Sequence, residues 1–385
     1  MTMATLSQEF ERYVRKIFPA QDYIPLHAPQ FRGNERQYVL DTLESTFVSS
    51  VGNYVDKFEI AIAEFTGSQY VIATNTGTSA LHIALMLCGV GKEDEVVTQS
   101  LTFVGTSNAI RYCGAHPVFV DVERETLGLS PKKLAEFLEE NTEVRDDGLC
   151  WNRVSNRIIK VCVPVHNLGH PVRCQDIQEI CAQYHISVVE DAAESLGSVS
   201  NGVHTGRIGR TGILSFNGNK IVTTGGGGAI MTDDKDIARK AKHLTTTAKK
   251  SHPWLFLHDK VGYNYRLPNL NAALGCGQME QLPTYVESKR KLASLYQHWF
   301  NQREVEFIME PRAAISNYWL NAILLENRSE RDCFLQYMND RGIMTRPMWT
   351  PLHTLPMYKN CLRGPLQMTE HIEDRLVNIP SSVIG

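Results

Sequence analysis

The sequence predicts an α/β protein. We expect a large three-layer domain, with helices covering a mainly parallel sheet, followed by a smaller C-terminal α+β domain. Strand-like and helical patterns alternate through the first two thirds of the chain, which favours a parallel sheet. At 385 residues the chain is also longer than a typical single domain. The pattern changes beyond about Thr245, so we expect a first unit of residues 1–248, which includes an N-terminal segment, and a second of 249–385.

Each element has its own signal in the sequence. A helix is expected from about Thr78, because apolar residues recur at helical spacing, namely at Leu81, Ala84, Leu85 and Cys88. Short apolar runs predict buried strands at 95–98, 117–121, 158–165, 186–191, 212–216 and 229–232. Helices are predicted between strands at 104–111 and 174–184. In the C-terminal part we expect a long helix at 269–300, a strand at 323–325 and a helix at 331–341.

Composition excludes several classes of protein. The 39 basic and 42 acidic residues leave a net charge of −3, which argues against a general nucleic-acid or membrane-surface role. The nine cysteines include no C-x-x-C pair and are expected to be reduced thiols in the core. Residues 1–21 contain no apolar signal-peptide region, and no stretch approaches the ~20 apolar residues of a membrane span. We therefore expect a soluble cytoplasmic protein.

Asp191 and Lys220 are the most informative pair of residues. Asp191 ends the apolar run 186–191, and ligands bind at the carboxyl ends of strands in open α/β sheets. Lys220 lies between Phe216 and the glycines 225–228, where the backbone must approach another group closely. A pyridoxal phosphate (PLP) site needs a lysine that forms a Schiff base and an acid that keeps the pyridine nitrogen protonated. The pair therefore predicts a PLP site, although Asp191 could instead cap the next helix.

Other segments have two possible explanations each. The turn Thr74–Leu81 leads into a helix, whose N-terminus favours a phosphate, but taken alone it is more often an ordinary cap. Ser215 could offer a hydroxyl to the same phosphate. Glu194 could complete a capping box or reach a ligand. His166 and His170 lack a third zinc ligand at a recognisable spacing, so we expect no metal and a loop that lines the cofactor pocket, with structural histidines as the alternative.

The absence of three known motifs argues against three further classes of protein. The chain has no G-x-x-x-x-G-K-[ST] sequence, so it is not a P-loop protein. Its glycine run does not fit G-x-G-x-x-G after a strand, which disfavours a dinucleotide fold. A G-x-S-x-G nucleophile elbow is also missing from the sequence, so an α/β-hydrolase is not supported.

Together these segments resemble the sugar-nucleotide aminotransferases of the DegT/DnrJ/EryC1/StrS family, which are fold type I PLP-dependent transferases. The resemblance runs from Pro25-Leu-His-Ala-Pro29 to Pro351-Leu-His353. It implies that Lys220 bonds PLP, that Asp191 pairs with the pyridine nitrogen and that Phe103 stacks on the ring. It also implies that Glu194 lies near the phenolic oxygen, where many relatives carry Gln. The expected phosphate and first-turn contacts are Gly77, Thr78, Ser79 and Ser215.

The same resemblance implies an oligomeric state and substrate contacts. Asn264, in Gly262-Tyr-Asn-Tyr-Arg266, matches a residue that reaches the phosphate of the neighbouring subunit, which implies a homodimer with shared active sites. The expected substrate contacts are His166, Lys249, Arg266 and Arg346. The basic stretch that contains Lys249 could meet a diphosphate or simply be a solvated loop.

The implied reaction is amino transfer from L-glutamate to C4 of a 4-keto-6-deoxy nucleotide sugar, through PLP and pyridoxamine phosphate. Phe47-Val-Ser-Ser-Val-Gly52 and residues 217–224 look most like the subgroup that aminates UDP-linked 2-acetamido sugars, precursors of bacillosamine or legionaminic acid. Two alternatives are kept. One is the dehydratase branch of the family, disfavoured because it carries histidine at the position of Lys220. The other is a non-catalytic nucleotide-sugar-binding regulatory protein.

Overall fold

The computed structural model describes residues 2–19, 21–50 and 52–384 of the chain. Its centre is a seven-stranded sheet in the order β1-β11-β10-β7-β6-β2-β3. Strand β11 runs antiparallel to β1 and β10, and the other neighbours are parallel. The strands are β1 (Tyr70–Thr74), β2 (Glu95–Gln99), β3 (His116–Val120), β6 (Ile159–Val163), β7 (Ser187–Asp191), β10 (Thr211–Ser215) and β11 (Gly228–Thr232).

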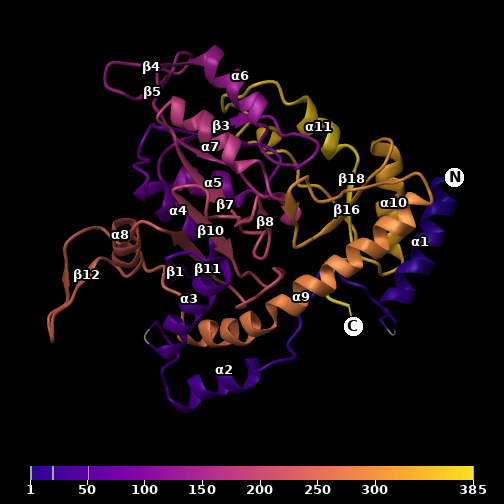
Figure 1. The fold of residues 1–385 in the computed structure, drawn as a ribbon, viewed down its shortest axis with the longest axis horizontal. Helices are drawn as coiled ribbons and strands as arrows, with labels where there is room; N and C mark the ends of the chain where they lie inside the picture. Colours follow the sequence, from indigo (N-terminus) through magenta and orange to yellow (C-terminus); the bar gives the residue numbers. More distant parts are fainter. Residues whose placement is uncertain (1, 20, 51, 385) are drawn as a thin grey trace.

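Helices cover both faces of this sheet, which confirms the predicted α/β class (Figure 1). Successive strand residues enter different cores, since side chains alternate across a strand: Val96 packs beside helices α4 and α5, whereas Val97 packs beside α6 and α7. The helices of this part of the chain are α2 (Glu35–Glu44), α3 (Asn53–Thr66), α4 (Gly77–Leu87), α5 (Gly105–Tyr112), α6 (Pro131–Asn141), α7 (Cys174–Gln183) and α8 (Lys235–Thr245).

The C-terminal part contains a four-stranded antiparallel sheet in the order β14-β16-β18-β17. Helix α9 (Asn269–Asn301) runs from the large sheet to this smaller one, and α2 and α3 pack along its first half. The other elements are β14 (Glu306–Phe307), β16 (Asn321–Leu324), α10 (Arg328–Asp340), β17 (Arg346–Pro347), η2 (Leu352–Thr354), α11 (Gln367–Glu373) and β18 (Leu376–Ile379).

Helix α1 (Met3–Ile17) packs in the core of the C-terminal part, although the two are far apart in the sequence. Figure 1 shows α1 beside α10, and the Phe10 ring lies 5.1 Å from that of Phe300 and 5.7 Å from that of Phe334. This helix belongs to the N-terminal segment of the unit predicted as residues 1–248. Burial of its apolar stripe places α1 against the core of the C-terminal part.

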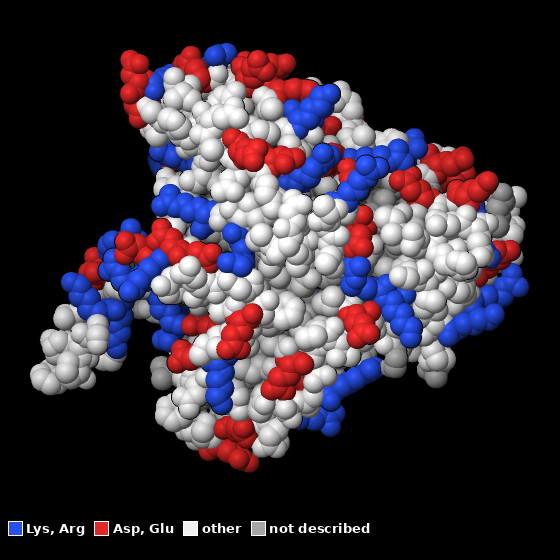
Figure 2. Space-filling view, viewed as in Figure 1, with Lys and Arg blue, Asp and Glu red and all other residues white. Residues whose placement is uncertain are grey.

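Short elements complete the fold. They are β4 (Thr142–Val144), β5 (Cys150–Asn152), η1 (Asn167–Gly169), β8 (Val199–Ser200), β9 (Val203–His204), β12 (Lys249–Lys250), β13 (Leu257–His258) and β15 (Ala314–Ile315). Strands β12 and β13 belong to residues 249–261, here named the arm, which projects from the body of the protein (Figures 1 and 2). Trp254 and Phe256 of the arm are 76% and 81% exposed.

The described ranges contain neither a membrane-spanning helix nor a cluster of metal-binding side chains. No helix there is both long enough and apolar enough to cross a membrane. Nor does any group of three or more His, Cys, Asp or Glu side chains among those residues come together as a metal site would require.

Candidate active site

A cavity of about 680 Å³ lies at the carboxyl ends of the large sheet, closed on one side by the C-terminal part. Strands β1, β7 and β10 all end at its wall. The C-terminal part supplies aromatic, methionine and arginine side chains. Eight residues predicted from the sequence line the cavity, namely Gly77, Thr78, Phe103, Asp191, Glu194, Ser215, Lys220 and Arg346.

Asp191 is the last residue of β7 and its carboxylate is buried. Oδ2 accepts a hydrogen bond from Thr106 Oγ1 at 2.8 Å, and Oδ1 accepts one from the Ala193 amide at 3.2 Å. Burial raises the pKa of Asp191, and the hydrogen bond from Thr106 opposes that rise. A buried carboxylate facing a cavity is suited to a ligand that carries an N–H group or a positive charge.

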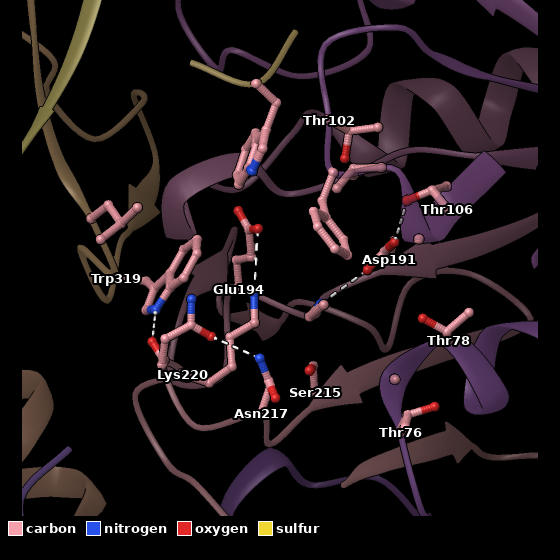
Figure 3. Close-up of a pocket in the computed structure, with 18 of the residues that line it drawn as sticks. Thr76, Thr78, Thr102, Thr106, Asp191, Glu194, Ser215, Asn217, Lys220 and Trp319 are labelled. Carbon is pink, nitrogen blue, oxygen red and sulfur yellow. Dashed lines mark hydrogen bonds and ion pairs between the residues drawn. The ribbon is translucent and has the colours of Figure 1, made fainter. Parts of the chain in front are cut away.

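Lys220 lies in a tight turn. Its backbone amide donates to the Asn217 carbonyl at 3.0 Å. Its Nζ donates to Glu194 Oε1 at 3.4 Å and lies 3.9 Å from the centroid of the Trp319 ring. Figure 3 shows Lys220, Glu194 and Trp319 together on one side of the cavity. Glu194 is buried, and its other oxygen accepts from the Leu168 amide at 2.8 Å. Burial raises the pKa of Glu194, while the charge of Lys220 opposes the rise.

The N-terminus of α4 forms the opposite side of the cavity. Thr76 caps this helix by accepting from the Ser79 amide at 3.0 Å. The amides of Gly77 and Thr78 donate to no group in the described part of the chain. A Cβ at Gly77 would lie 3.0 Å from the Cβ of Ser215, so glycine allows the two segments to approach closely. These free N–H groups lie beside the hydroxyls of Thr78 and Ser215, and the combination suits an anion such as a phosphate.

Phe103 follows β2 and reaches the mouth of the cavity, where its side chain is 54% exposed. A Cβ at Gly105 would lie 3.1 Å from the Phe103 ring and 3.2 Å from Thr78 Oγ1. The aromatic ring therefore lies between the loop after β2 and the start of α4, where it can cover a flat ligand.

His166 and Ser79 do not line the cavity. His166 is fully buried; its Nε2 lies 3.1 Å from Glu190 Oε2, and its Nδ1 accepts from the Val172 amide at 3.1 Å. Both ring nitrogens thus serve the packing behind β7, and the structure gives no support to a substrate contact for His166. The Ser79 hydroxyl lies 2.9 Å from Thr76 Oγ1, within the first turn of the helix. The loop that contains His170 is likewise packed inside, with that ring edge-on to Tyr318.

Three predicted residues lie outside the cavity of their own chain. Asn264 and Arg266 belong to a segment that runs beside β1, where Arg266 bridges Thr74. Lys249 is exposed on the arm, with Nζ 4.3 Å from the Phe256 ring. Arg346 on β17 does reach the cavity.

Two residues of the site were missed by the sequence analysis. Thr106, which donates to Asp191, lies in the first turn of the predicted helix 104–111, on the carboxyl side of the predicted strand 95–98, and that position could have indicated it. Trp319 lies in the C-terminal part, remote in sequence from Lys220, and no local pattern links the two residues. Only the fold brings them together.

Comparison with known proteins supports the same kind of site. The profile of the DegT/DnrJ/EryC1/StrS aminotransferase family matches residues 29–383. A GDP-perosamine synthase of Escherichia coli O157:H7 is 35% identical over 360 residues, 93% of each chain. EpsN of Bacillus subtilis (strain 168), provisionally named a pyridoxal phosphate-dependent aminotransferase, is 36% identical over 340 residues, 88% of this chain and 84% of EpsN. The crystal structure of the aminotransferase TlmJ from Streptoalloteichus hindustanus superposes with a TM-score of 0.83 at 27% identity, covering 93% of both chains.

Proposed function

Because the chain belongs to the DegT/DnrJ/EryC1/StrS aminotransferase family and is a PLP-dependent sugar aminotransferase, we propose that it transfers the amino group of L-glutamate to the C4 carbonyl of a 4-keto-6-deoxy nucleotide sugar. The observation that carries the proposal is a single cavity with one lysine amine and two buried carboxylates, Asp191 and Glu194. Both the dehydratase and the non-catalytic alternative are less consistent with a family of aminotransferases and with Lys220 at this position.

The residues present fit PLP. The Lys220 amine faces the cavity and can bond the aldehyde of the cofactor. Asp191 offers a buried carboxylate to the pyridine nitrogen. The unpaired amides of Gly77 and Thr78, together with the Ser215 hydroxyl, suit the phosphate. Phe103 offers an aromatic face to the ring.

When bound, PLP supplies an electron sink that allows an amino group to leave one carbon skeleton and join another. In the proposed mechanism Asp191 holds a proton at the pyridine nitrogen, and Thr106 keeps the carboxylate in place. Lys220 Nζ removes a proton from the Cα of glutamate and, in the second half-reaction, delivers one to C4 of the sugar. Positioned general acid–base groups of this kind contribute ~10²–10⁴-fold to rate. Glu194 Oε1, 3.4 Å from Nζ, accepts a hydrogen bond from the amine and keeps it in position.

The substrate and the partner subunit complete the proposal. Arg346, a cation on the cavity wall, is assigned to the diphosphate. Asn264, Arg266 and Lys249 do not line the cavity of their own chain, so we assign them to the site of a second copy in a homodimer. The exposed apolar side chains of the arm support a partner, since large apolar groups that gather on a surface mark interaction sites.

For the nucleotide sugar, a UDP-linked 2-acetamido-2,6-dideoxy-4-ketohexose is the first candidate. Its support is the likeness of two segments, Phe47–Gly52 and 217–224. The second of these carries Lys220, and the first packs on the start of α9, where Asn269 Nδ2 donates to the Phe47 carbonyl at 2.6 Å. Val51, within the first segment, lies outside the described residues.

A GDP-linked sugar is the second candidate. Three curated relatives named GDP-perosamine synthase are 35%, 32% and 32% identical to this chain over 93% of its length. Relatives at this distance can differ in substrate, so we keep the UDP sugar first and let the experiment decide.

A cytoplasmic location is part of the proposal. All nine cysteines are unpaired, as expected where thiols stay reduced.

A substrate panel tests the function. The holoenzyme is incubated with L-glutamate and UDP-, GDP- or TDP-linked 4-keto-6-deoxy sugars, and the products are identified by mass spectrometry. We expect 2-oxoglutarate and a 4-amino sugar from the UDP-linked 2-acetamido substrate. Amination of the GDP sugar alone would support the second candidate, and no amination of any 4-keto sugar would refute the proposal.

A further inference from the structure

The amine of Lys220 has two neighbours of a kind that favours positive charge. One is the Glu194 carboxylate, whose Oε1 lies 3.4 Å from Nζ. The other is the face of the Trp319 indole, 3.9 Å from Nζ to the ring centroid. Glu194 and Trp319 are only 5% and 3% exposed, so water competes weakly for these contacts. Glu194 and Lys220 lie in loops that follow the neighbouring strands β7 and β10, so their contact arises within the large sheet. The contact with the indole forms only because the C-terminal part packs against the cavity.

The Trp319 ring is held in place by its own contacts. Its Nε1 donates to the carbonyl of Asn219 at 2.8 Å, and Asn219 directly precedes Lys220. Its backbone amide donates to Asn317 Oδ1 at 2.8 Å. The Trp349 ring lies nearly parallel to it, with centroids 6.5 Å apart and planes 11° apart. The same indole therefore fixes the turn that carries the lysine and faces the amine at the end of the side chain.

An aromatic face attracts an ammonium group through its negative potential, and the attraction grows when water is excluded. A neutral amine gains little from that face or from a carboxylate. The two contacts therefore hold the end of the Lys220 side chain in one place, and both are stronger when that end is an ammonium group. During amino transfer the amine takes a proton from one carbon, becomes an ammonium group and gives the same proton to another carbon, so no other reactant is needed.

We propose that Trp319 is a positioning residue for amino transfer: its indole face, with the Glu194 carboxylate, holds the Lys220 ammonium group in the cavity while that group carries a proton from one carbon to the next. The inference rests on the proposed function, because it gives Lys220 the role of proton carrier. It adds a residue from the C-terminal part to the machinery of the large sheet.

Two substitutions separate the aromatic face from the hydrogen bond. Trp319→Phe keeps an aromatic face but loses the donor to Asn219, whereas Trp319→Leu loses both. The first readout is the pH midpoint of the visible absorbance band of the holoenzyme, which reports how strongly the site favours positive charge. We expect Leu to lower the midpoint by about 0.5–1.5 pH units and Phe to leave it nearly unchanged. The second readout is kcat with glutamate, which we expect Leu to reduce about tenfold with KM little changed.

Trp151→Leu is the matched control, because Trp151 also carries a cation on its face, Arg145 at 4.4 Å, but lies outside the cavity. We expect no change in midpoint or kcat. Glu194→Gln removes the charge and keeps the shape, and it should shift the midpoint in the same direction as Leu. A thermal melt shows whether Trp319→Leu is folded. If it is not, the midpoint of Glu194→Gln provides the test instead.

Two results would overturn the inference. One is a wild-type midpoint and kcat in folded Trp319→Leu, or, should that variant not fold, an unshifted midpoint in Glu194→Gln. The other is an equal shift in the Phe and Leu variants, which would assign the effect to the hydrogen bond with Asn219. Failure of the proposed function looks different, because the wild-type enzyme would then lack the visible band or the response of that band to glutamate.

Discussion

At the scale of single residues, the cavity combines two acids with different neighbours. Asp191 is bonded to a hydroxyl and an amide, whereas Glu194 is bonded to an amide and to the Lys220 amine. Burial raises the pKa of both groups. The physical difference lies in the bonded groups: Glu194 accepts a hydrogen bond from a lysine amine, whereas the two bonds that Asp191 accepts come from uncharged groups.

We expect Asp191→Asn to reduce kcat on the order of 10³-fold, equivalent to about 4 kcal/mol at 1.36 kcal/mol per factor of ten. The amide keeps the shape of the carboxylate but cannot stabilise a protonated pyridine nitrogen. Steady-state kinetics with glutamate and the nucleotide sugar provide the measurement. Thr106→Val, which removes only the hydrogen bond to Oδ2, should have a smaller effect in the same direction. A kcat for Asp191→Asn close to that of the wild type would rule out the electronic role of Asp191.

Local sequence was sufficient for the residues that lie at strand ends and in glycine-rich turns. Gly77 was predicted from a polar turn that leads into a helix, and Ser215 from a hydroxyl close to the candidate lysine in the sequence. Asp191 was predicted because a strand that ends in a polar residue already indicates the ligand side of a sheet. His166 follows the same rule and lines no part of the cavity, since its ring turns back toward the buried Glu190. Whether such a side chain faces the ligand or the core depends on packing that the sequence does not reveal.

At the scale of elements, helix α9 carries a fully buried lysine. The Nζ of Lys289 donates to the Ser381 carbonyl, and burial lowers the pKa of Lys289 to about 7. The lysine of the unfolded chain keeps its ordinary pKa near 10.5, so between about pH 7 and 10.5 the unfolded state binds more protons. The contribution of Lys289 to stability is therefore fully present above about pH 10.5 and is lost as the pH falls to 7.

Lys289→Met removes this dependence on pH. The stability of the wild-type protein relative to that variant should rise between pH 7 and pH 10, by an amount on the order of 4 kcal/mol across the full window. Thermal denaturation of both proteins at several pH values provides the measurement. Lys291→Met, at an exposed position of the same helix, is the control and should show a constant difference. A constant difference for Lys289→Met as well would contradict the depressed pKa.

Strand β11 and helix α4 approach each other too closely for a side chain between them. A Cβ at Gly228 would lie 2.5 Å from the Gly77 amide nitrogen. We expect Gly228→Ala to displace the start of α4 and to weaken PLP binding at least tenfold, measured by titrating the stripped protein with PLP. Gly218→Ala is the control, since its Cβ would meet nothing within 4 Å. Equal PLP affinity in the two variants would argue against the phosphate site at this helix.

Elements with a strong period were predicted to within a few residues. Strand β7 and helices α4 and α7 are examples, because their apolar faces are set by burial on the sheet. The antiparallel direction of β11 was not predicted, since a buried strand looks the same in either direction. Two-residue strands such as β8 and β12 have no period to detect, and they form only because a partner strand is brought beside them.

At the scale of the whole molecule, the cavity needs both parts of the chain and, in our proposal, a second copy. Asp191 and Lys220 come from the large sheet, whereas Trp319 and Arg346 come from the C-terminal part. Helix α1 strengthens that second part from the opposite end of the sequence. Long-range pairing of this kind could not be predicted from local patterns, because it depends on which apolar surfaces meet.

A mixing experiment tests the shared site. Lys220→Ala and Asn264→Ala should each be nearly inactive alone, because one lacks the reacting amine and the other the proposed contact across the dimer. Co-expression of the two variants should restore activity, since a mixed dimer contains one site with both residues intact. Light scattering establishes whether each protein is a dimer. Asn264→Ala with full activity by itself, or a monomeric wild-type protein, would argue against shared sites.

The most direct measurement on the central claim is reductive trapping of the holoenzyme. Borohydride converts a carbon–nitrogen double bond between PLP and a lysine into a permanent link, and digestion followed by mass spectrometry locates it. The account predicts one pyridoxyl group per chain, on the peptide that contains Lys220. A label on another lysine, or a reduced protein with no label at all, would contradict it.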